Sequence, residues 1–146
     1  MQQNPQALLR EARSWIGTPY QHQASQKGAG CDCLGFIRGL YRLLHGSEPA
    51  VQADYAPEWA ELKGEDLLFK AARRYLHQVN GPLHQPKLAE VIVFRWAPQC
   101  PCKHLGLMSG NDHFLHAYEA VGVVESPLVP MWRNKIAGRF SFFPID

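Results

Sequence analysis

The sequence has little of what marks several large classes of protein. Its 146 residues include only four cysteines, too few for a domain stapled by disulfides. The formal charge at neutral pH is +2 and no run of lysine or arginine occurs, so no nucleic-acid partner is expected. No apolar run reaches the roughly 18 residues that a membrane span needs, so we expect no membrane span either.

The N-terminus also lacks the parts of a secretion signal. Residues 1–5, Met-Gln-Gln-Asn-Pro, offer neither a basic segment nor the apolar stretch that should follow it. We therefore expect synthesis in the cytoplasm without a standard export signal. A reducing compartment of that kind would keep the four cysteines free.

What the sequence does have is the balance of a folded domain. Hydrophobic residues make up 46% and charged residues 19%, which argues against disorder, and the length suits a single domain over residues 1–146. Helices followed by strands predict an α+β domain, with N-terminal helices packed on a C-terminal antiparallel β-sheet. The spacing predicts helices over 5–16, 33–45 and 65–76, and strands over 90–96, 104–108, 113–118, 122–125 and 139–143.

The chain is organised around residues 30–44, which read Gly-Cys-Asp-Cys-Leu-Gly-Phe and then continue with helical apolar spacing. Asp32 is a good N-cap, which places Cys33 in the first turn of the helix. Unpaired backbone N–H groups and the positive end of the helix dipole favour a thiolate there, so Cys33 is the candidate nucleophile. Cys31 precedes the cap and lies beyond that argument. Taken alone, the stretch fits a buried cysteine in an ordinary core helix equally well.

A second pattern concerns histidines on two neighbouring strands. If the turn between them is centred near Gly110, facing residues have numbers that sum to about 220, which pairs His104 with His116 on one face of the sheet. His113 then points to the opposite face. A helix packed on the face of the two rings would present Cys33 to them and complete a Cys-His-X arrangement. The spacing also fits two histidines that only satisfy each other within the sheet.

Three short blocks, which follow the family's order along the chain, and a further His-Ala pair resemble a known family, the NlpC-type cell-wall cysteine peptidases, which have a papain-like core. The resemblance covers about residues 12–143. Residues 32–36 resemble the family's D-C-S-G-[LF] nucleophile block, with Leu34 in place of the usual serine. The other blocks are Gly-Thr-Pro-Tyr at 17–20, similar to G-x-P-Y; His-Leu-Gly-Leu at 104–107, similar to H-[VL]-G-[IL]; and His-Ala at 116–117.

The resemblance implies a peptidase that uses a Cys-His-His triad and no cofactor. Cys33 would be the nucleophile, His104 the base and His116 the residue that orients it, while Tyr20 and Asp32 would contact the substrate or the oxyanion. The implied substrate is a peptidoglycan stem peptide, cut between D-γ-glutamate and a diamino acid.

The Cys-Leu-Gly variant at residues 33–35 looks most like the phage-type branch of the family, found with tail-tip and gene-transfer-agent proteins. That branch implies phage tail-tip or baseplate proteins as partners. It also implies action in the periplasm or cell wall as part of a phage-like particle. The family's P-G-D segment corresponds only loosely to residues 88–90.

Other functions remain open from the residues. Two Cys-x-Cys pairs, 31–33 and 100–102, with His104 nearby, would supply soft ligands for a structural zinc ion, although a single intervening residue strains chelation. The domain could also be a tail component whose peptidase site is vestigial. A third alternative keeps the thiol chemistry and changes the acceptor, which gives an acyltransferase or an amidase.

Overall fold

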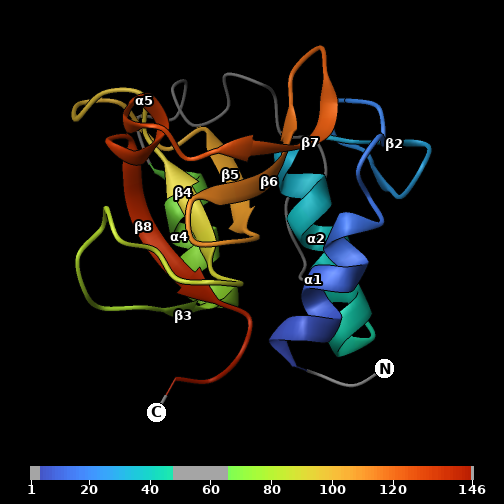
Figure 1. The fold of residues 1–146 in the computed structure, drawn as a ribbon, viewed down its shortest axis with the longest axis horizontal. Helices are drawn as coiled ribbons and strands as arrows, with labels where there is room; N and C mark the ends of the chain where they lie inside the picture. Colours follow the sequence, from blue (N-terminus) through green and yellow to red (C-terminus); the bar gives the residue numbers. More distant parts are fainter. Residues whose placement is uncertain (1–3, 48–65, 146) are drawn as a thin grey trace.

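A computed structural model of the chain describes residues 4–47 and 66–145. Figure 1 shows the two N-terminal helices on one side and a strongly curved sheet on the other. No helix in the described ranges is long and apolar enough to cross a membrane. The elements, in chain order, are α1 (Pro5–Arg13), β1 (Ser25–Gln26), β2 (Gly30–Cys31), α2 (Cys33–His45), α4 (Leu67–Tyr75), β3 (His77–Gln78), β4 (Val91–Phe94), β5 (His104–Met108), β6 (His113–Tyr118), β7 (Gly122–Pro127), α5 (Pro130–Arg133) and β8 (Ile136–Ser141).

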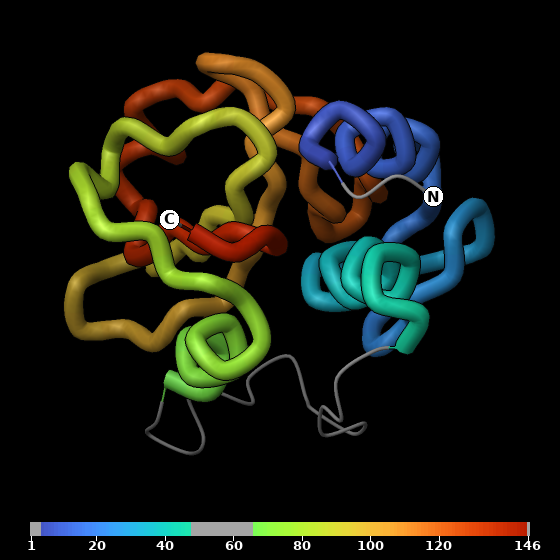
Figure 2. The backbone as a smooth tube through the Cα atoms, turned by 90° about the horizontal axis from the view of Figure 1, so that it is seen from below, coloured from blue at the N-terminus to red at the C-terminus, as the bar shows by residue number. Residues whose placement is uncertain are grey.

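The main sheet has six strands in the order β3-β8-β4-β5-β6-β7, and all its pairs are antiparallel. Helices α1 and α2 lie side by side beyond one face of this sheet, and α4 covers the same face farther along (Figure 1; Figure 2). α2 contacts β5 and β6, whereas α4 contacts β3 and β8. The predicted α+β fold, with N-terminal helices packed on an antiparallel sheet, is therefore confirmed.

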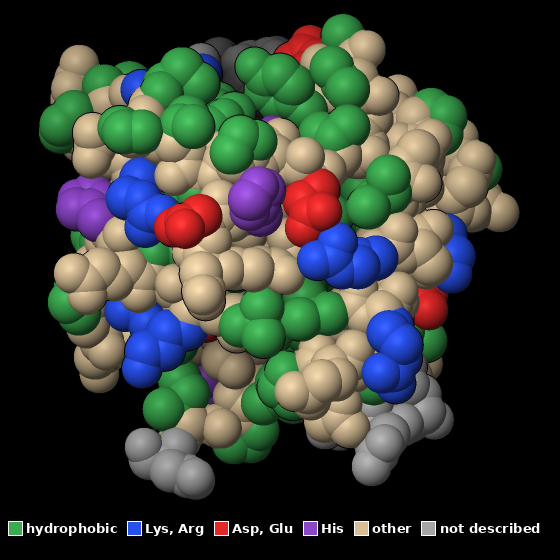
Figure 3. Space-filling model, viewed as in Figure 1, with side chains coloured by type: hydrophobic (Ala, Val, Ile, Leu, Met, Phe, Trp, Pro, Cys, Tyr) green, Lys and Arg blue, Asp and Glu red, His purple; other side chains and the backbone are tan. Residues whose placement is uncertain are grey.

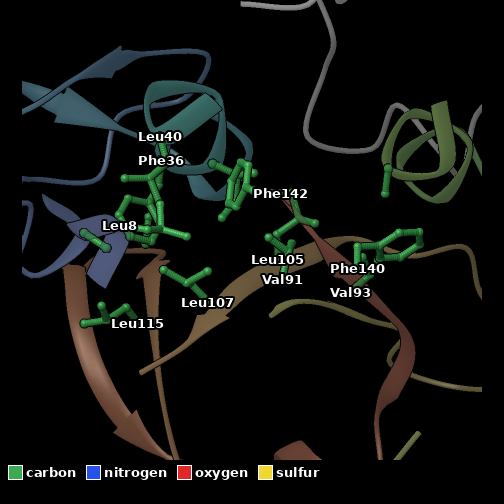
Figure 4. Close-up of a cluster of buried hydrophobic side chains, with 14 of the residues drawn as sticks. Leu8, Phe36, Leu40, Val91, Val93, Leu105, Leu107, Leu115, Phe140 and Phe142 are labelled. Carbon is green, nitrogen blue, oxygen red and sulfur yellow. The ribbon is translucent and has the colours of Figure 1, made fainter. Parts of the chain in front are cut away.

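The sheet buries side chains on both faces. Figure 4 shows the side toward the helices, where Leu107 of β5 lies toward Phe36 of α2, and Phe140 of β8 lies toward α4. The opposite face carries a smaller cluster of residues from the intervening strand positions together with α5: Ile92, Phe94, Met108, Phe114, Leu128, Trp132 and Ile136. Because neighbouring strand residues point to opposite faces, strands buried on both sides are nearly continuously apolar.

Local signals determine where the first two helices begin and end. The side chain of Asn4 accepts a hydrogen bond from the backbone of Ala7, and Pro5 is the first helical residue of α1. α1 ends at Arg13, short of the predicted residue 16, and Ile16 is exposed. α2 begins at Cys33, after its N-cap Asp32, and ends before Gly46. Gly46 has a φ of 78°, the left-handed conformation that glycines after a helix C-terminus often adopt.

Several predicted boundaries differ from the structure. The helix expected over 65–76 is shorter, because Asp66 is its N-cap and accepts a hydrogen bond from the backbone of Phe69; residue 65 lies outside the described ranges. The strand expected over 139–143 runs over Ile136–Ser141 instead. Strands β1, β2 and β3 have two residues each, too short for a periodic pattern to predict.

A buried ion pair braces the loop that leads into β4. Arg139 of β8 donates to both carboxylate oxygens of Glu90, from Nε at 2.8 Å and from Nη2 at 3.0 Å, and Nη1 donates to the carbonyl of Pro82 at 3.1 Å. Both side chains are almost completely buried. Such a pair contributes little net stability against an apolar replacement, but breaking it leaves an uncompensated buried charge.

Arg139→Met should therefore lower the free energy of unfolding by roughly 3–5 kcal/mol, since the buried side chain of Glu90 loses its partner. Urea unfolding followed by circular dichroism measures this difference. Lys27→Met is the matched control, because the Lys27–Glu11 pair is largely exposed, and it should change stability by less than about 1 kcal/mol. Equal effects of the two substitutions would contradict the argument.

Candidate active site

Cys33 occupies the first turn of α2, as predicted. The two carboxylate oxygens of Asp32 fix this turn. Oδ1 accepts from the backbone of Gly35 at 2.7 Å, and Oδ2 accepts from the backbone of Gln23 at 2.8 Å. Asp32 is buried, and both its oxygens are engaged in tying the loop before α2 to the helix. It holds the backbone on which Cys33 sits.

The sulfur of Cys33 lies against the start of β5. The thiol donates to the carbonyl of Lys103, with 3.8 Å between sulfur and oxygen, and the backbone N–H groups of Leu105, Leu34 and Cys33 itself interact with the sulfur. The nucleophile candidate is thus placed beside the residues on either side of His104.

The surroundings of Cys33 oppose the thiolate that its position at the start of α2 favours. Burial raises the pKa of the thiol to about 12, and the negative charge of Asp32 adds to the shift. The backbone N–H groups of Leu105, Leu34 and Cys33 lower the pKa, but by less. The helix dipole favours a thiolate, but the side chain of Asp32, which caps the helix, brings an anion close to the sulfur.

Asp32→Asn should make Cys33 easier to alkylate, because the substitution removes that anion while asparagine remains a good N-cap. Two charges 4 Å apart interact by about 1 kcal/mol even in water, so iodoacetamide should modify Cys33 at least about five-fold faster at pH 8. Mass spectrometry of the peptides distinguishes Cys33 from the other cysteines. Asp112→Asn, in the exposed β5–β6 turn, is the control and should leave the rate unchanged; an unchanged rate in Asp32→Asn itself would contradict the assignment.

His104 and His116 form a buried pair. Nε2 of His104 lies 2.7 Å from Nδ1 of His116, and the two residues are 6% and 1% exposed. The predicted pairing of their strands is wrong in register. The observed pairs Leu107–Leu115 and Met108–Phe114 have numbers that sum to 222, because the turn is centred on residue 111 instead of Gly110. A shift of two residues keeps both histidines on one face, and as diagonal neighbours their long side chains still meet.

The face on which the two rings lie also differs from the prediction. They pack against Phe94, Phe114 and Trp132, on the side of α5, whereas α2 packs on the opposite face. Among the described residues, the β5–β6 ladder comprises only the two pairs nearest the turn. The other end of β5 is not paired with β6, and there the N-terminus of α2 contacts β5. Cys33 therefore approaches the edge of β5 and not the face on which the two rings lie.

Aromatic side chains enclose His104. Trp96 stacks on its ring at a centroid distance of 6.0 Å and an interplanar angle of 22°, and Trp132 lies 5.5 Å away. Burial lowers the pKa values of both His104 and His116, and the neighbouring ring of His116 lowers that of His104 further. Both imidazoles are therefore neutral at pH 7, which leaves His104 able to accept a proton.

The surface beside His104 is apolar. Trp96 is 39% exposed and Tyr118 is 43% exposed, and their rings lie 6.0 and 6.3 Å from that of His104. Figure 3 shows hydrophobic side chains gathered along the upper edge of the molecule, over α5 and the β6–β7 hairpin. Exposed residues of these two segments include Met131, Val129 and Val121.

Tyr20, the other predicted contact for substrate or oxyanion, lies next to the nucleophile. It forms a β-bridge with Cys31. Burial raises the pKa of its hydroxyl to about 12, and Cys33 and Asp32 contribute to that rise. The hydroxyl therefore stays protonated at neutral pH and can donate a hydrogen bond.

The residues of the zinc alternative do not come together. In the described part of the chain, no three His, Cys, Asp or Glu side chains are grouped as ligands for a metal ion. Cys102 is buried, where its backbone donates to Asp66 at 3.1 Å and its sulfur accepts from Arg95 at 3.8 Å. This contact joins the cap of α4 to the loop before His104. Asp66 lies within the helix predicted over 65–76, and nothing in the local sequence indicates this contact with a loop more than thirty residues away.

Comparison with known proteins gives the fold. No family profile matches the sequence, and no curated protein does. Among solved structures, an NlpC/p60 family protein from Bacillus cereus is 20% identical, with a TM-score of 0.68 over 97% of this chain and 41% of that one. A Staphylococcus aureus protein of the same family, described as similar to a lipoprotein, is 17% identical, with a TM-score of 0.64 over 97% of this chain and 42% of that one.

The NlpC/p60 domain of the peptidoglycan hydrolase SagA is similar over nearly its whole length. It is 22% identical, with a TM-score of 0.62, and the match covers 94% of this chain and 98% of that one. This chain thus spans less than half of the Bacillus and Staphylococcus proteins but almost all of an isolated domain. Helices packed on a six-stranded antiparallel sheet therefore form an NlpC/p60-like fold, which this chain shares with these three proteins.

Proposed function

We propose that the protein is a cysteine peptidase that hydrolyses peptidoglycan stem peptides. The observation that carries this proposal is the contact of the Cys33 sulfur with the backbone beside His104, whose ring is hydrogen-bonded to that of His116. A thiol, a neutral base and a group that orients the base are the parts of a nucleophilic acyl-transfer site.

In the proposed reaction the proton moves as the sulfur attacks. The raised pKa of Cys33 and the lowered pKa of His104 make thiol and neutral imidazole the resting state. Nδ1 of His104, the nitrogen not occupied by His116, takes the thiol proton while the sulfur bonds to the amide carbon. Backbone N–H of Cys33 and the hydroxyl of Tyr20 donate to the oxyanion.

The intermediate then collapses in two further steps. The carbon–nitrogen bond breaks, and His104 returns its proton to the leaving amine, which leaves a thioester on Cys33. Water attacks the thioester and gives a proton to His104, which passes it back to the departing sulfur. The acid is released and the thiol restored, so the cycle consumes water alone.

The finer proposal is that the bond cut joins D-γ-glutamate to the diamino acid. Its support is the resemblance of residues 32–36 and 104–107 to the blocks of the cell-wall peptidases, together with the fold shared with the SagA domain. We propose further that the enzyme acts in the periplasm or cell wall as part of a phage-like particle with tail-tip or baseplate proteins. The Cys-Leu-Gly variant at residues 33–35 supports that part of the proposal.

Product analysis on purified peptidoglycan tests the proposal. The wild-type protein should release fragments with a new amino group on the diamino acid and a new free carboxyl on D-glutamate, as identified by mass spectrometry. Cys33→Ala should release none, whereas Cys100→Ala, in the loop before β5, should behave as wild type. A different cleaved bond would leave a cysteine peptidase of other specificity. No cleavage by wild type, under conditions in which an active peptidoglycan hydrolase cuts the same sample, would contradict the proposed function.

A further inference from the structure

The hydrogen-bonded pair of histidines continues onto a third strand. Nε2 of His116 lies 2.8 Å from Oγ of Ser126, which belongs to β7. His116 directly faces Val124 across the β6–β7 ladder, so Ser126 is its diagonal neighbour, as His116 is of His104. His104, His116 and Ser126 thus form a line of polar groups across β5, β6 and β7, on the face covered by α5.

The hydroxyl at the end of this line is the only member that is not a ring nitrogen. A neutral imidazole carries one proton, so each ring donates from one nitrogen and accepts at the other. Two arrangements of the protons satisfy both hydrogen bonds. They differ in the nitrogen of His104 that is left without a proton, and they are therefore not equivalent for the proposed reaction.

In the first arrangement Ser126 accepts. His116 then carries its proton on Nε2, its Nδ1 accepts from Nε2 of His104, and Nδ1 of His104 keeps a free lone pair. In the second arrangement Ser126 donates to Nε2 of His116, both rings carry their protons on Nδ1, and His104 has no basic nitrogen to offer a thiol. Only the first arrangement can start the reaction.

We propose that Ser126 is a positioning residue that fixes the tautomers of His116 and His104 by accepting a hydrogen bond from Nε2–H of His116. Ser126 is partly exposed, so its own hydroxyl proton can turn to solvent while the oxygen accepts. His116 is buried and cannot turn a ring proton to solvent, and its Nδ1 is already hydrogen-bonded to His104. The inference rests on the proposed function for its consequence, but the tautomers themselves can be observed without any substrate.

Nitrogen-15 NMR of protein labelled in its histidine rings provides the direct test, because protonated and unprotonated ring nitrogens resonate far apart. In the wild type, His104 and His116 should both carry the proton on Nε2. In Ser126→Ala the acceptor is gone, and the ratio of Nε2–H to Nδ1–H tautomers should fall by roughly five- to ten-fold in both rings. Ser126→Thr keeps the hydroxyl on a strand residue and should restore the wild-type ratio.

Val124→Ala is the matched control, since it trims the residue that faces His116 on the same strand and leaves the hydrogen bond in place. Its tautomer ratio should equal that of the wild type. On peptidoglycan, kcat should fall by roughly ten-fold in Ser126→Ala and recover in Ser126→Thr.

The role of Ser126 and the proposed peptidase function can be contradicted separately. A proton on Nδ1 of His104 in the wild type, or identical tautomers in wild type and Ser126→Ala, would overturn the role of Ser126 even if the enzyme is active. A wild type with the expected tautomers that leaves peptidoglycan uncut would uphold the positioning role and remove the proposed function.

Discussion

Replacing His104 by alanine should lower kcat/KM on peptidoglycan by about a thousand-fold or more while the domain stays folded. General acid–base catalysis by a positioned histidine contributes roughly 10²–10⁴ to the rate. Because the pKa of the Cys33 thiol is raised, loss of His104 also removes the group that would take the thiol proton. Steady-state release of stem-peptide fragments measures the effect, and circular dichroism verifies the fold.

His113→Ala is the control for this substitution. His113 is on β6, three residues from His116 and on the opposite face, and its side chain is exposed. Its removal should leave kcat/KM within about two-fold of wild type, as is usual for exposed positions. A His104→Ala protein that keeps a tenth of the wild-type rate, with the same product, would show that another group is the base.

The parts of this site that follow from local sequence could be predicted. Asp32 as N-cap, Cys33 in the first turn and Gly46 as the stop of α2 depend on contacts within a few residues. The pairing of His104 with His116 was predicted from a register that is wrong by two residues. The prediction of the pair was still correct, because a register shift of two residues leaves each side chain on the same face of the sheet.

The parts that depend on distant segments could not be predicted. The choice of face for α2 follows from packing of Phe36 and Leu40 on Leu107, across more than sixty residues of chain. Ser126 joins the histidines only because β7 pairs with β6 in the observed register. The sequence pattern predicts that the strand of β4 ends at Trp96, whereas β4 ends at Phe94. The stacking of Trp96 on His104 could therefore not be predicted from the pattern.

The pKa of Cys33 illustrates the same division within a single side chain. Its position at the start of a helix was visible in the sequence, and the backbone N–H groups do lower the pKa as expected. Burial of the sulfur, which lies against the carbonyl of Lys103 more than sixty residues away, raises the pKa by more than these N–H groups lower it. A site that keeps its nucleophile protonated at rest depends on the correct tautomer of His104, which makes the hydrogen bonds around that ring decisive for the proposed chemistry.

Gly35→Ala should damage both stability and activity, although alanine normally favours a helix by about 1 kcal/mol over glycine. A Cβ atom at Gly35 would lie 1.8 Å from the carbonyl oxygen of Ala24 and 3.0 Å from Oδ1 of Asp32. The loop before α2 must therefore move away from the first helical turn. We expect a loss of at least about 2 kcal/mol in the free energy of unfolding. A displacement of about 1 Å at Cys33 should lower kcat/KM by roughly a hundred-fold.

Two other glycines separate these effects. A Cβ at Gly110 would meet nothing closer than 4.0 Å, so Gly110→Ala should change neither stability nor activity. At Gly39, one turn farther along α2, a Cβ would lie 2.4 Å from the ring of Trp15, remote from the sulfur. Gly39→Ala should therefore destabilise the domain while the folded molecules keep their kcat/KM. If Gly35→Ala behaved like Gly39→Ala, with turnover intact per folded molecule, the close contact of Ala24 with the first turn of α2 would not be what positions the nucleophile.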